Sequence, residues 1–244
     1  MNPRPKILSI AGFDPSGGAG VLADVKTFEQ HKVLGMGIST ANTIQNENEF
    51  IAVNWIDETQ IFSQLEILIK KHTFQFVKIG LVPNLQFLIE VLNRLCSGGT
   101  KIIWDPILSS SSGFDFKHDL SELNTVLKKI FLITPNWNET KTLSAEEEAM
   151  RGAKKLSKLT KVYLKGGHNS EQRGKDFLFT NGKVFPFNPK GKKVSEKHGS
   201  GCVFSSALAA NLTKGYPIVK ACLQSKEYVT KVLESNESLL GYHK

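Results

Sequence analysis

Cysteine is scarce in this 244-residue chain, where Cys96, Cys202 and Cys222 are the only three and none belongs to a Cys-x-x-Cys pair. Such spacing offers no disulfide framework, so a reducing compartment is the simpler expectation. Long apolar runs are also missing, which argues against a membrane-spanning helix. The N-terminal residues lead directly into a strand-like segment, unlike a secretory signal. We therefore expect a soluble, cytoplasmic protein.

Internal repeats, low-complexity tracts and linkers are absent too, and the length suits a single domain over residues 1–244. Apolar residues make up 40% of the chain and charged residues 22%, as in ordinary globular proteins. The 31 Lys and Arg exceed the 23 Asp and Glu, which gives a net charge of +8. Since aromatic residues do not interleave with this basic excess, we expect no nucleic-acid partner. The basic run at 190–193 either attracts an anionic ligand such as ATP or is a solvated hairpin face.

Short apolar segments alternate with segments of helical period along most of the chain. The pattern predicts strands at 7–10, 37–41, 76–79, 101–104, 131–134 and 161–164. It predicts helices at 21–30, 61–70, 85–95, 120–129, 145–156, 203–213 and 218–233. Residues 177–187, with an Asn-Gly turn, are instead predicted to form an antiparallel hairpin. Strands that alternate with helices of this length predict an α/β domain whose parallel sheet is covered on both faces.

Polar residues and glycines gather where the predicted strands end. Those ends carry Gly12–Gly20, Gln45–Asn46, Gly80, Asp105–Pro106, Asn136–Glu139 and Gly166–Gly167. Each loop alone could use such residues simply to turn the chain. In an open α/β sheet, however, ligands bind at the carboxyl ends of the strands. The set as a whole therefore predicts a ligand-binding edge.

The first of these loops, Gly12–Gly20, lets the backbone approach a ligand closely and presents N–H groups at the start of a helix. Its glycines also match a loose dinucleotide-binding pattern, which Glu47 or Glu49 would complete, so a dinucleotide-dependent oxidoreductase is one alternative. Asp14 and Asp24 could receive polar groups of a small substrate. They could also cap the turn and face solvent, and for Asp24 this second interpretation is favoured.

Two carboxylates and an amide follow neighbouring predicted strands, at Asp105, Asn136 and Glu139. Such a set can hold Mg²⁺ through waters, as phosphate-handling sites do. Glu139 could equally be a solvated helix cap. Lys165 stands where it could meet a phosphate, although a lysine at a strand end is often simply exposed.

The segment His198-Gly-Ser-Gly-Cys202 precedes a predicted helix. Successive backbone N–H groups there would form an anion-binding nest, which the helix dipole strengthens. We expect the Cys202 thiol in the first helical turn to have a lowered pKa and to act as a base or nucleophile. It could instead be a small buried hydrophobe, as is expected for Cys96 and Cys222. Cys202 with His198 also leaves an acyl-transfer enzyme open.

Seven segments together resemble hydroxymethylpyrimidine/phosphomethylpyrimidine kinases, the thiamine-biosynthesis branch of the ribokinase-like fold. They are AGFDPSGGAG (11–20), IQN (44–46), KIG (78–80), DP (105–106), LITPNWNE (132–139), LKGGH (164–168) and HGSGCVFSSALAA (198–210). The resemblance covers essentially the whole chain. It implies a three-layer α/β/α sandwich with a mostly parallel central sheet, and a homodimer. It also implies that ATP phosphorylates 4-amino-5-hydroxymethyl-2-methylpyrimidine and then converts the monophosphate to the diphosphate.

The resemblance further assigns roles to individual residues. Those that would hold the pyrimidine are Gly12, Asp24, Gln45, Gly80, Leu81 and Ile107. The anion hole for the transferring phosphoryl group would consist of Gly199, Ser200, Gly201 and Cys202, with Cys202 replacing the Asp base of most ribokinase-like relatives. ATP would lie along Asn136, Lys165, Gly167, Gly199 and Gly201, and Mg²⁺ at Asp105 and Glu139.

Four departures from the family pattern keep alternatives open. Phe13 stands where Ser is usual and Leu81 where Met is common, so a pyridoxal kinase is the nearest alternative. Residues 109–112 lack a lysine that often follows the DP motif, and residues 239–244 lack the usual glycine-rich tail. These last two leave room for a catalytically weak homologue that only binds a ligand or regulates.

Overall fold

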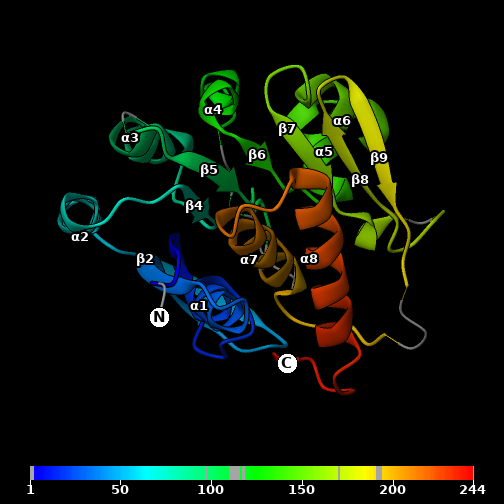
Figure 1. Ribbon diagram of the computed structural model, residues 1–244, viewed down its shortest axis with the longest axis horizontal. Helices are drawn as coiled ribbons and strands as arrows, with labels where there is room; N and C mark the ends of the chain where they lie inside the picture. The colour runs from blue at the N-terminus through cyan, green and yellow to red at the C-terminus, as the bar shows by residue number, and fades with distance from the viewer. Residues whose placement is uncertain are drawn as a thin grey trace.

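The computed structural model describes residues 3–96, 98–109, 116, 119–169, 171–190 and 194–243. Within them, a nine-stranded sheet crosses the molecule in the order β3-β2-β1-β4-β5-β6-β7-β8-β9. Helices cover both of its faces (Figure 1). The expected three-layer α/β/α architecture is therefore confirmed.

The strands are β1 (Lys6–Phe13), β2 (Leu34–Gln45), β3 (Phe50–Trp55), β4 (Phe76–Ile79), β5 (Lys101–Trp104), β6 (Leu132–Ile133), β7 (Lys161–Leu164), β8 (Asp176–Thr180) and β9 (Lys183–Phe187). The helices are α1 (Gly20–Gln30), α2 (Glu58–Lys71), α3 (Leu85–Cys96), α4 (Leu123–Lys129), α5 (Trp137–Ser144), α6 (Ala149–Leu156), α7 (Ser200–Thr213) and α8 (Ile218–Leu233), with a 3₁₀ turn η1 (Gly166–His168).

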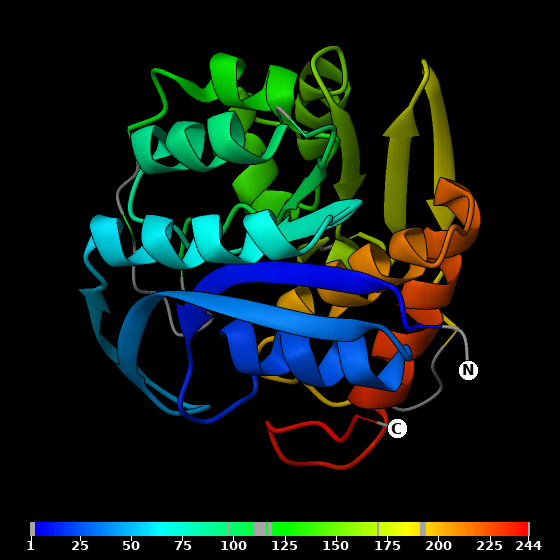
Figure 2. The same ribbon diagram turned by 60° about the vertical axis from the view of Figure 1, so that its left-hand side comes forward.

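The sheet is parallel at its centre and antiparallel at both edges. β1 pairs in parallel with β2 and β4, and the parallel pairing continues through β5 and β6 to β7. Figure 2 shows β1 and β2 running side by side above α1. β3 runs antiparallel to β2 at one edge, and the hairpin β8–β9 forms the other. The predictions of a mostly parallel sheet and of the hairpin are confirmed.

Two features of the fold were not predicted. The edge strand β3 was missed because it is exposed or half-buried and is held by its pairing with β2, so it carries little hydrophobic pattern of its own. The helix predicted at 145–156 is wrong in its first part, because Ala145 adopts a left-handed conformation with φ of 53° and ends α5. The chain then restarts as α6 at Ala149.

Two apolar layers hold the helices against the sheet. One contains side chains of α2 to α6, such as Leu65, Leu88 and Val126, against Val77 and Ile102 of the strands. The other, on the opposite face, gathers side chains of α1, α7 and α8. α7 lies at the centre of this second layer, and every residue from Cys202 to Thr213 is buried. A helix buried on all sides shows no amphipathic stripe, which is why its sequence looks uniformly apolar.

None of the helices in the described ranges combines the length and the apolar character that crossing a lipid bilayer would require.

Replacing Phe28 by alanine should destabilise the protein strongly. Phe28 of α1 is fully buried against Ile7 and Val33, so Phe28→Ala should cost about 3–5 kcal/mol of unfolding free energy. Ile67 of α2 is 70% exposed, and Ile67→Ala should change it by less than about 0.5 kcal/mol. Urea unfolding of both variants checks this, and equal midpoints would contradict the assigned core.

Candidate active site

The carboxyl ends of β5, β6 and β7 meet at Asp105. Its carboxylate is buried and accepts hydrogen bonds from Lys165 Nζ at 2.7 Å, Thr134 Oγ1 at 3.0 Å and Ser205 Oγ at 3.1 Å. The same Lys165 Nζ would lie 3.1 Å from a β-carbon at Gly201 in the first turn of α7. Lys165 is therefore not a merely exposed lysine. It sets a positive charge beside the backbone N–H groups of the α7 N-terminus.

Asn136 and Glu139 cap the start of α5. The Asn136 side chain accepts from Glu139 N at 2.8 Å, and the Glu139 carboxylate accepts from Asn136 N at 2.6 Å. Glu139 is a cap as one interpretation held, but it is buried rather than solvated. Burial raises its pKa to about 7, Lys165 lowers it and Asp105 raises it.

The donor set at this edge suits a divalent cation. Asp105 and Glu139 are buried carboxylates close enough to perturb each other. Mg²⁺ is commonly held by one or two carboxylates together with substrate phosphates. The residues present therefore fit this ion.

Gly166, at the end of β7, is held by a second buried network. Its backbone N–H donates to Asp176 Oδ1 at 2.7 Å, while Asp176 Oδ2 accepts from Tyr163 at 2.8 Å and from Lys226 Nζ at 2.6 Å. None of these three side chains has a role that the sequence predicted. The neighbouring Gly167 is exposed, with nothing within 4 Å of a β-carbon at that position.

Asp24 lies inside the protein, so the interpretation that it faces solvent is wrong. Both of its oxygens accept from Lys78 Nζ, at 3.0 and 2.8 Å, and the hydroxyls of Ser9 and Ser206 also donate to them. Lys78 is fully buried as well. A lysine inside an apolar strand requires a carboxylate partner, and that signal could have identified the pair. A contact of Asp24 with a pyrimidine stays a prediction.

The N-terminus of α7 is closely fitted to the loop after β1. Gly199 has a φ of 70°, and a β-carbon there would stand 2.0 Å from the carbonyl oxygen of Gly18. Gly20 repeats this arrangement, with a φ of 61° and a β-carbon position 2.2 Å from the carbonyl oxygen of Gly12. Only glycine meets both conditions. The glycines of the two motifs therefore bring the loop and the helix start together.

The thiol of Cys202 is 7% exposed, and its expected low pKa is wrong for this structure. Burial raises the pKa to about 11, while Lys78 lowers it, Asp105 and Asp24 raise it, and a backbone hydrogen bond with Gly20 lowers it. The sequence could not reveal this, because the burial and the two carboxylates come from distant segments.

Asp14 joins the first loop to the segment before α7. It is buried, accepts from Ala19 N at 2.8 Å and from Ser16, and lies 2.8 Å from His198 Nε2. Burial works to raise the pKa of Asp14, but the hydrogen bonds with His198, Ser16 and Ala19 lower it overall. Nε2 of His198 is thus engaged with Asp14 rather than with Cys202.

The proposed pyrimidine residues are brought together in part. A β-carbon at Gly12 would lie 3.1 Å from Leu81 Cδ2, so these two are adjacent. Gln45 Nε2 donates to Thr43 Oγ1 at 2.8 Å, and Thr43 donates to the carbonyl of Phe13 at 2.8 Å, which ties Gln45 to the end of β1. Ile107 is half-buried in the loop after β5.

A cavity of about 210 Å³ opens between the β2–β3 turn and the segment before α7. It is lined by Asn46, Glu47, Asn48, Glu49, Glu196, Lys197, His198 and Leu239. Glu47 and Glu49 thus lie on the β2–β3 turn. Ser110–Ser112, and residues 191–193 of the basic run, lie outside the described residues.

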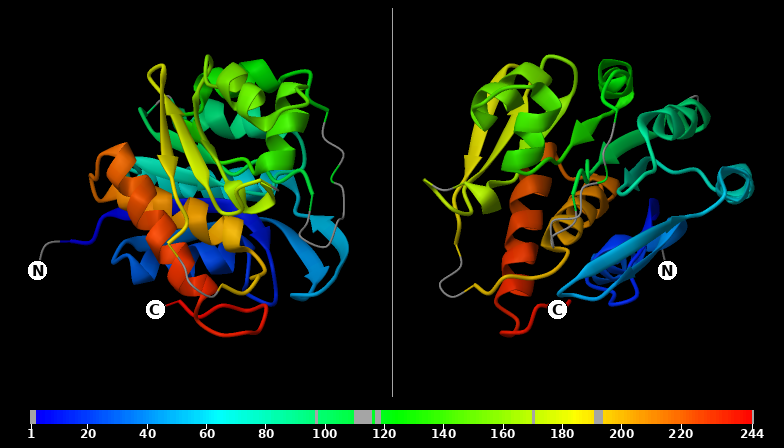
Figure 3. Two further views of the ribbon diagram at one scale, coloured as in Figure 1. Left: turned by 90° about the vertical axis from the view of Figure 1, so that its right-hand side faces the viewer. Right: turned by 180° about the vertical axis from the view of Figure 1, so that it is seen from behind.

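The C-terminal segment after α8 packs against the segment that precedes α7. Lys197 Nζ donates to the carbonyls of Asn236 and Ser238, at 2.6 and 2.7 Å, and His198 N donates to Leu239 O at 2.9 Å. Figure 3 shows this segment passing below α8 toward α1. The tail therefore supports the segment that leads into α7.

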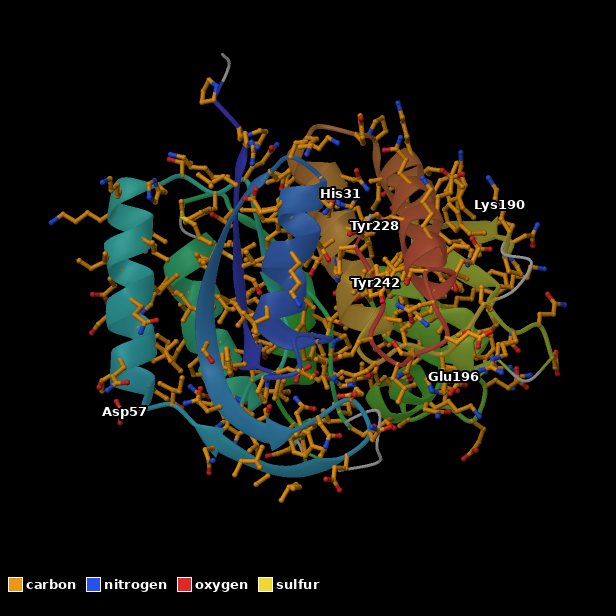
Figure 4. The ribbon with its side chains drawn as sticks, turned by 90° about the horizontal axis from the view of Figure 1, so that it is seen from below. His31, Asp57, Lys190, Glu196, Tyr228 and Tyr242 are labelled. Carbon is orange, nitrogen blue, oxygen red and sulfur yellow. The ribbon has the colours of Figure 1, made fainter. Side chains whose placement is uncertain are left out.

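The end of the tail is anchored between α1 and α8. His243 Nδ1 lies 2.9 Å from the hydroxyl of Tyr228, whose ring meets His31 at a centroid distance of 4.5 Å. Figure 4 shows Tyr228 and His31 close together, with Tyr242 of the tail on the same side. Burial, with smaller effects of Lys26 and His31, lowers the pKa of His243 to about 4.

Comparison with known proteins gives concordant results. A family model described as phosphomethylpyrimidine kinase matches residues 14–244. A hydroxymethylpyrimidine/phosphomethylpyrimidine kinase of Aquifex aeolicus is 33% identical, over 95% of each chain. These matches favour phosphoryl transfer over the oxidoreductase and acyl-transfer alternatives.

Solved structures agree on the fold. A phosphomethylpyrimidine kinase of Clostridium difficile superposes with a TM-score of 0.79 at 28% identity, over 93% of this chain and 98% of that one. A pyridoxal kinase of Bacillus subtilis superposes with a TM-score of 0.83 at 27% identity, over 94% and 92%.

Gly199→Ala should be far more disruptive than a substitution that imposes the same backbone strain alone. Gly182, in the β8–β9 turn, has a φ of 71° but nothing within 4 Å of a β-carbon. Gly182→Ala should therefore cost only the left-handed conformation, about 1–2 kcal/mol. Gly199→Ala adds a collision with Gly18, so its thermal unfolding midpoint should be clearly lower. Equal midpoints would contradict the close fit.

Acidification should weaken the docking of the tail. Because the folded pKa of His243 lies below the unfolded value of 6.5, the unfolded chain takes up the proton first as pH falls. The stability from neutral His243 is complete above about 6.5 and is lost towards pH 4. His243→Gln should remove this part of the pH dependence of the thermal unfolding midpoint, whereas His168→Gln at an exposed position should retain it. An unchanged profile in His243→Gln would refute the anchor.

Proposed function

Because this chain belongs to the phosphomethylpyrimidine kinase family, it is a phosphotransferase, and we propose that it phosphorylates 4-amino-5-hydroxymethyl-2-methylpyrimidine and then its monophosphate. The phosphoryl donor is ATP. The observation that carries the proposal is the position of Lys165 Nζ, bound to Asp105 and next to Gly201 at the start of α7. A lysine and several N–H groups at one point form a site for a phosphoryl group in transfer.

Positioning and charge would account for most of the catalysis. Phosphoryl transfer passes through a loose transition state in which negative charge spreads over the phosphoryl oxygens. We assign Gly199, Ser200, Gly201 and Cys202 to the anion hole around those oxygens, with Lys165 adding positive charge. ATP would extend from there along Asn136 and Gly167. The Asp176 network supports this assignment, because it fixes the backbone of Gly166.

The acceptor would bind against Gly12, Gly80, Leu81 and Ile107, with Gln45 bonding to polar atoms of the ring. The contact between Gly12 and Leu81 supports this pocket. The hydroxymethyl oxygen of the acceptor would face Cys202. Asp24 supports the pocket through its ion pair with Lys78.

Cys202 would take the proton of the attacking hydroxyl. Its pKa near 11 makes the thiolate a strong base but a sparse one at neutral pH. In a loose transition state the acceptor hydroxyl keeps its proton until late in the reaction, so modest base catalysis suffices. The charged groups around the Cys202 sulfur then determine which fraction of this thiol is ionised.

Mg²⁺ would be held by Asp105 and Glu139 together with the ATP phosphates. When bound, it neutralises phosphate charge.

We further propose a cytoplasmic homodimer. The apolar side chains of Ile44, Ile51 and Trp55, which are 50%, 61% and 38% exposed on β2 and β3, support self-association, and three free cysteines suit a reducing compartment.

A pyridoxal kinase is the second candidate. It is favoured by the superposition on the Bacillus subtilis enzyme. Both acceptors are flat nitrogen heterocycles with a hydroxymethyl group, so Phe13 and Leu81 could admit either. Phosphorylation of a monophosphate separates the two activities.

ADP release from ATP in the presence of Mg²⁺ tests the function. We expect turnover with the pyrimidine alcohol and with its monophosphate, and loss of about 100-fold or more in kcat for Cys202→Ala. Cys96→Ala, at a half-buried position on α3, is the matched control and should keep full turnover. Turnover on pyridoxal alone would favour the second candidate. The absence of ADP release with all three substrates would overturn the kinase assignment in favour of a ligand-binding homologue.

A further inference from the structure

The loop that follows β1 is closed on itself and carries part of the wall assigned to the acceptor. Its two ends touch, because a β-carbon at Gly20 would stand 2.2 Å from the carbonyl oxygen of Gly12. Between these ends, the buried Asp14 carboxylate accepts from Ser16 N at 2.9 Å and from Ala19 N at 2.8 Å. A displacement of Asp14 would therefore also move Gly12, which we assign to the acceptor pocket.

The ring of His198 ties this loop to the segment before α7. Its Nε2 lies 2.8 Å from Asp14 Oδ2, and both side chains are buried. An ionised carboxylate can only accept, so Nε2 is the donor in this bond. The ring also lies against the loop backbone, since a β-carbon at Gly18 would be 2.7 Å from its Cδ2 atom. With its N–H held by Leu239 O at 2.9 Å, His198 is fixed at both its ring and its main chain.

The loop and the start of α7 meet beside this pair. Gly199 follows His198 directly, and a β-carbon there would stand 2.0 Å from the carbonyl oxygen of Gly18. The carbonyl of Gly199 in turn accepts a hydrogen bond from Val203 N at 3.0 Å, in the first turn of α7. The His198 ring and the N-terminus of α7 therefore contact the same stretch of loop backbone.

Stability alone does not require a polar pair at this place. Replacing both partners of a buried hydrogen bond by apolar groups of similar shape can be nearly neutral. A hydrogen bond adds a preferred distance and direction between the two segments that it joins. The pair of Asp14 and His198 therefore fixes how far the loop stands from the helix start, which apolar packing would define less sharply.

That distance matters for the proposed reaction. The acceptor is assigned to the side of the loop, and the transferring phosphoryl group to the side of α7. Reacting atoms must approach to about 3–3.5 Å with aligned orbitals, and a misplacement of about 1 Å can cost about 100-fold in rate. A contact that spans both sides can therefore set the rate of transfer without touching the substrate.

We propose that His198 is a positioning residue for phosphoryl transfer, whose hydrogen bond to Asp14 holds the loop after β1 at a fixed distance from the first turn of α7. This inference rests on the proposed function. In the step it serves, the acceptor oxygen bonds to the γ-phosphorus and the bond from that phosphorus to the bridging oxygen of ADP breaks. The hydroxyl proton passes to the sulfur of Cys202. His198 takes part in none of these bond changes and acts through the backbone of Gly199.

Hydrogen exchange of the peptide that spans residues 14–20, followed by mass spectrometry, tests the contact without substrate. His198→Leu removes the donor at comparable volume, so exchange in this peptide should be about 10-fold faster, as expected when a buried acceptor loses its partner. His198→Gln places an amide donor where Nε2 lies and should keep the wild-type rate. Asn211→Leu removes a buried hydrogen bond between α7 and α8, from Asn211 Nδ2 to Ser225 Oγ at 3.0 Å, and should leave this peptide unchanged. Wild-type exchange in His198→Leu would overturn the proposal.

Steady-state kinetics of the same variants separate positioning from stability. His198→Leu should lose about 10- to 100-fold in kcat with little change in the KM for ATP, and His198→Gln should recover most of that loss. Asn211→Leu should lower the unfolding midpoint and keep the wild-type kcat. A kcat that follows the unfolding midpoint in all three variants, or that falls in His198→Leu without faster exchange, would refute the proposal.

A milder variant covers the case in which His198→Leu does not fold. His198→Asn stays polar, but its amide is too short to reach Asp14, so both measurements should give the results expected for His198→Leu. The exchange experiment needs no substrate. The absence of ADP release in the wild type refutes the assigned reaction, whereas unchanged exchange refutes this inference, so the two failures are distinguishable.

Discussion

Charges at the carboxyl edge of the sheet are neutralised within the protein, and the geometry of the site follows from that pairing. Lys78 is bound to Asp24, and Lys165 is bound to Asp105. An unpaired ammonium or carboxylate at such depth would cost several kcal/mol, on the order of 3–5. Each pair also joins different strands and helices, so neutralisation and alignment of these elements are achieved by the same contacts.

α7 lies between the two pairs. Ser205 donates to Asp105 and Ser206 donates to Asp24, so consecutive residues of one helix are bound to both carboxylates. This fixes the rotation of the helix about its axis and, with it, the direction of Cys202. The glycines at 18 and 199 then set how closely the helix start approaches the first loop.

Much of the architecture was predictable from the sequence. Apolar periodicity predicts the strands and most helices, because residues that face a core must be apolar in a regular order. The exceptions were held by pairing or capping rather than by pattern. β3 depends on β2, and α5 depends on the Asn136 and Glu139 cap.

The residue types of the site, and the edge of the sheet on which they lie, were determined by the sequence alone, because glycines, carboxylates and a lysine follow strand after strand. The environment of each group was decided only by the tertiary structure. Cys202 has a raised pKa instead of a lowered one, and Asp24 is a buried counter-charge instead of a solvated cap. The physical reason is that burial and long-range charge depend on neighbours that are distant in the chain, and Lys78 comes to Asp24 from 54 residues away.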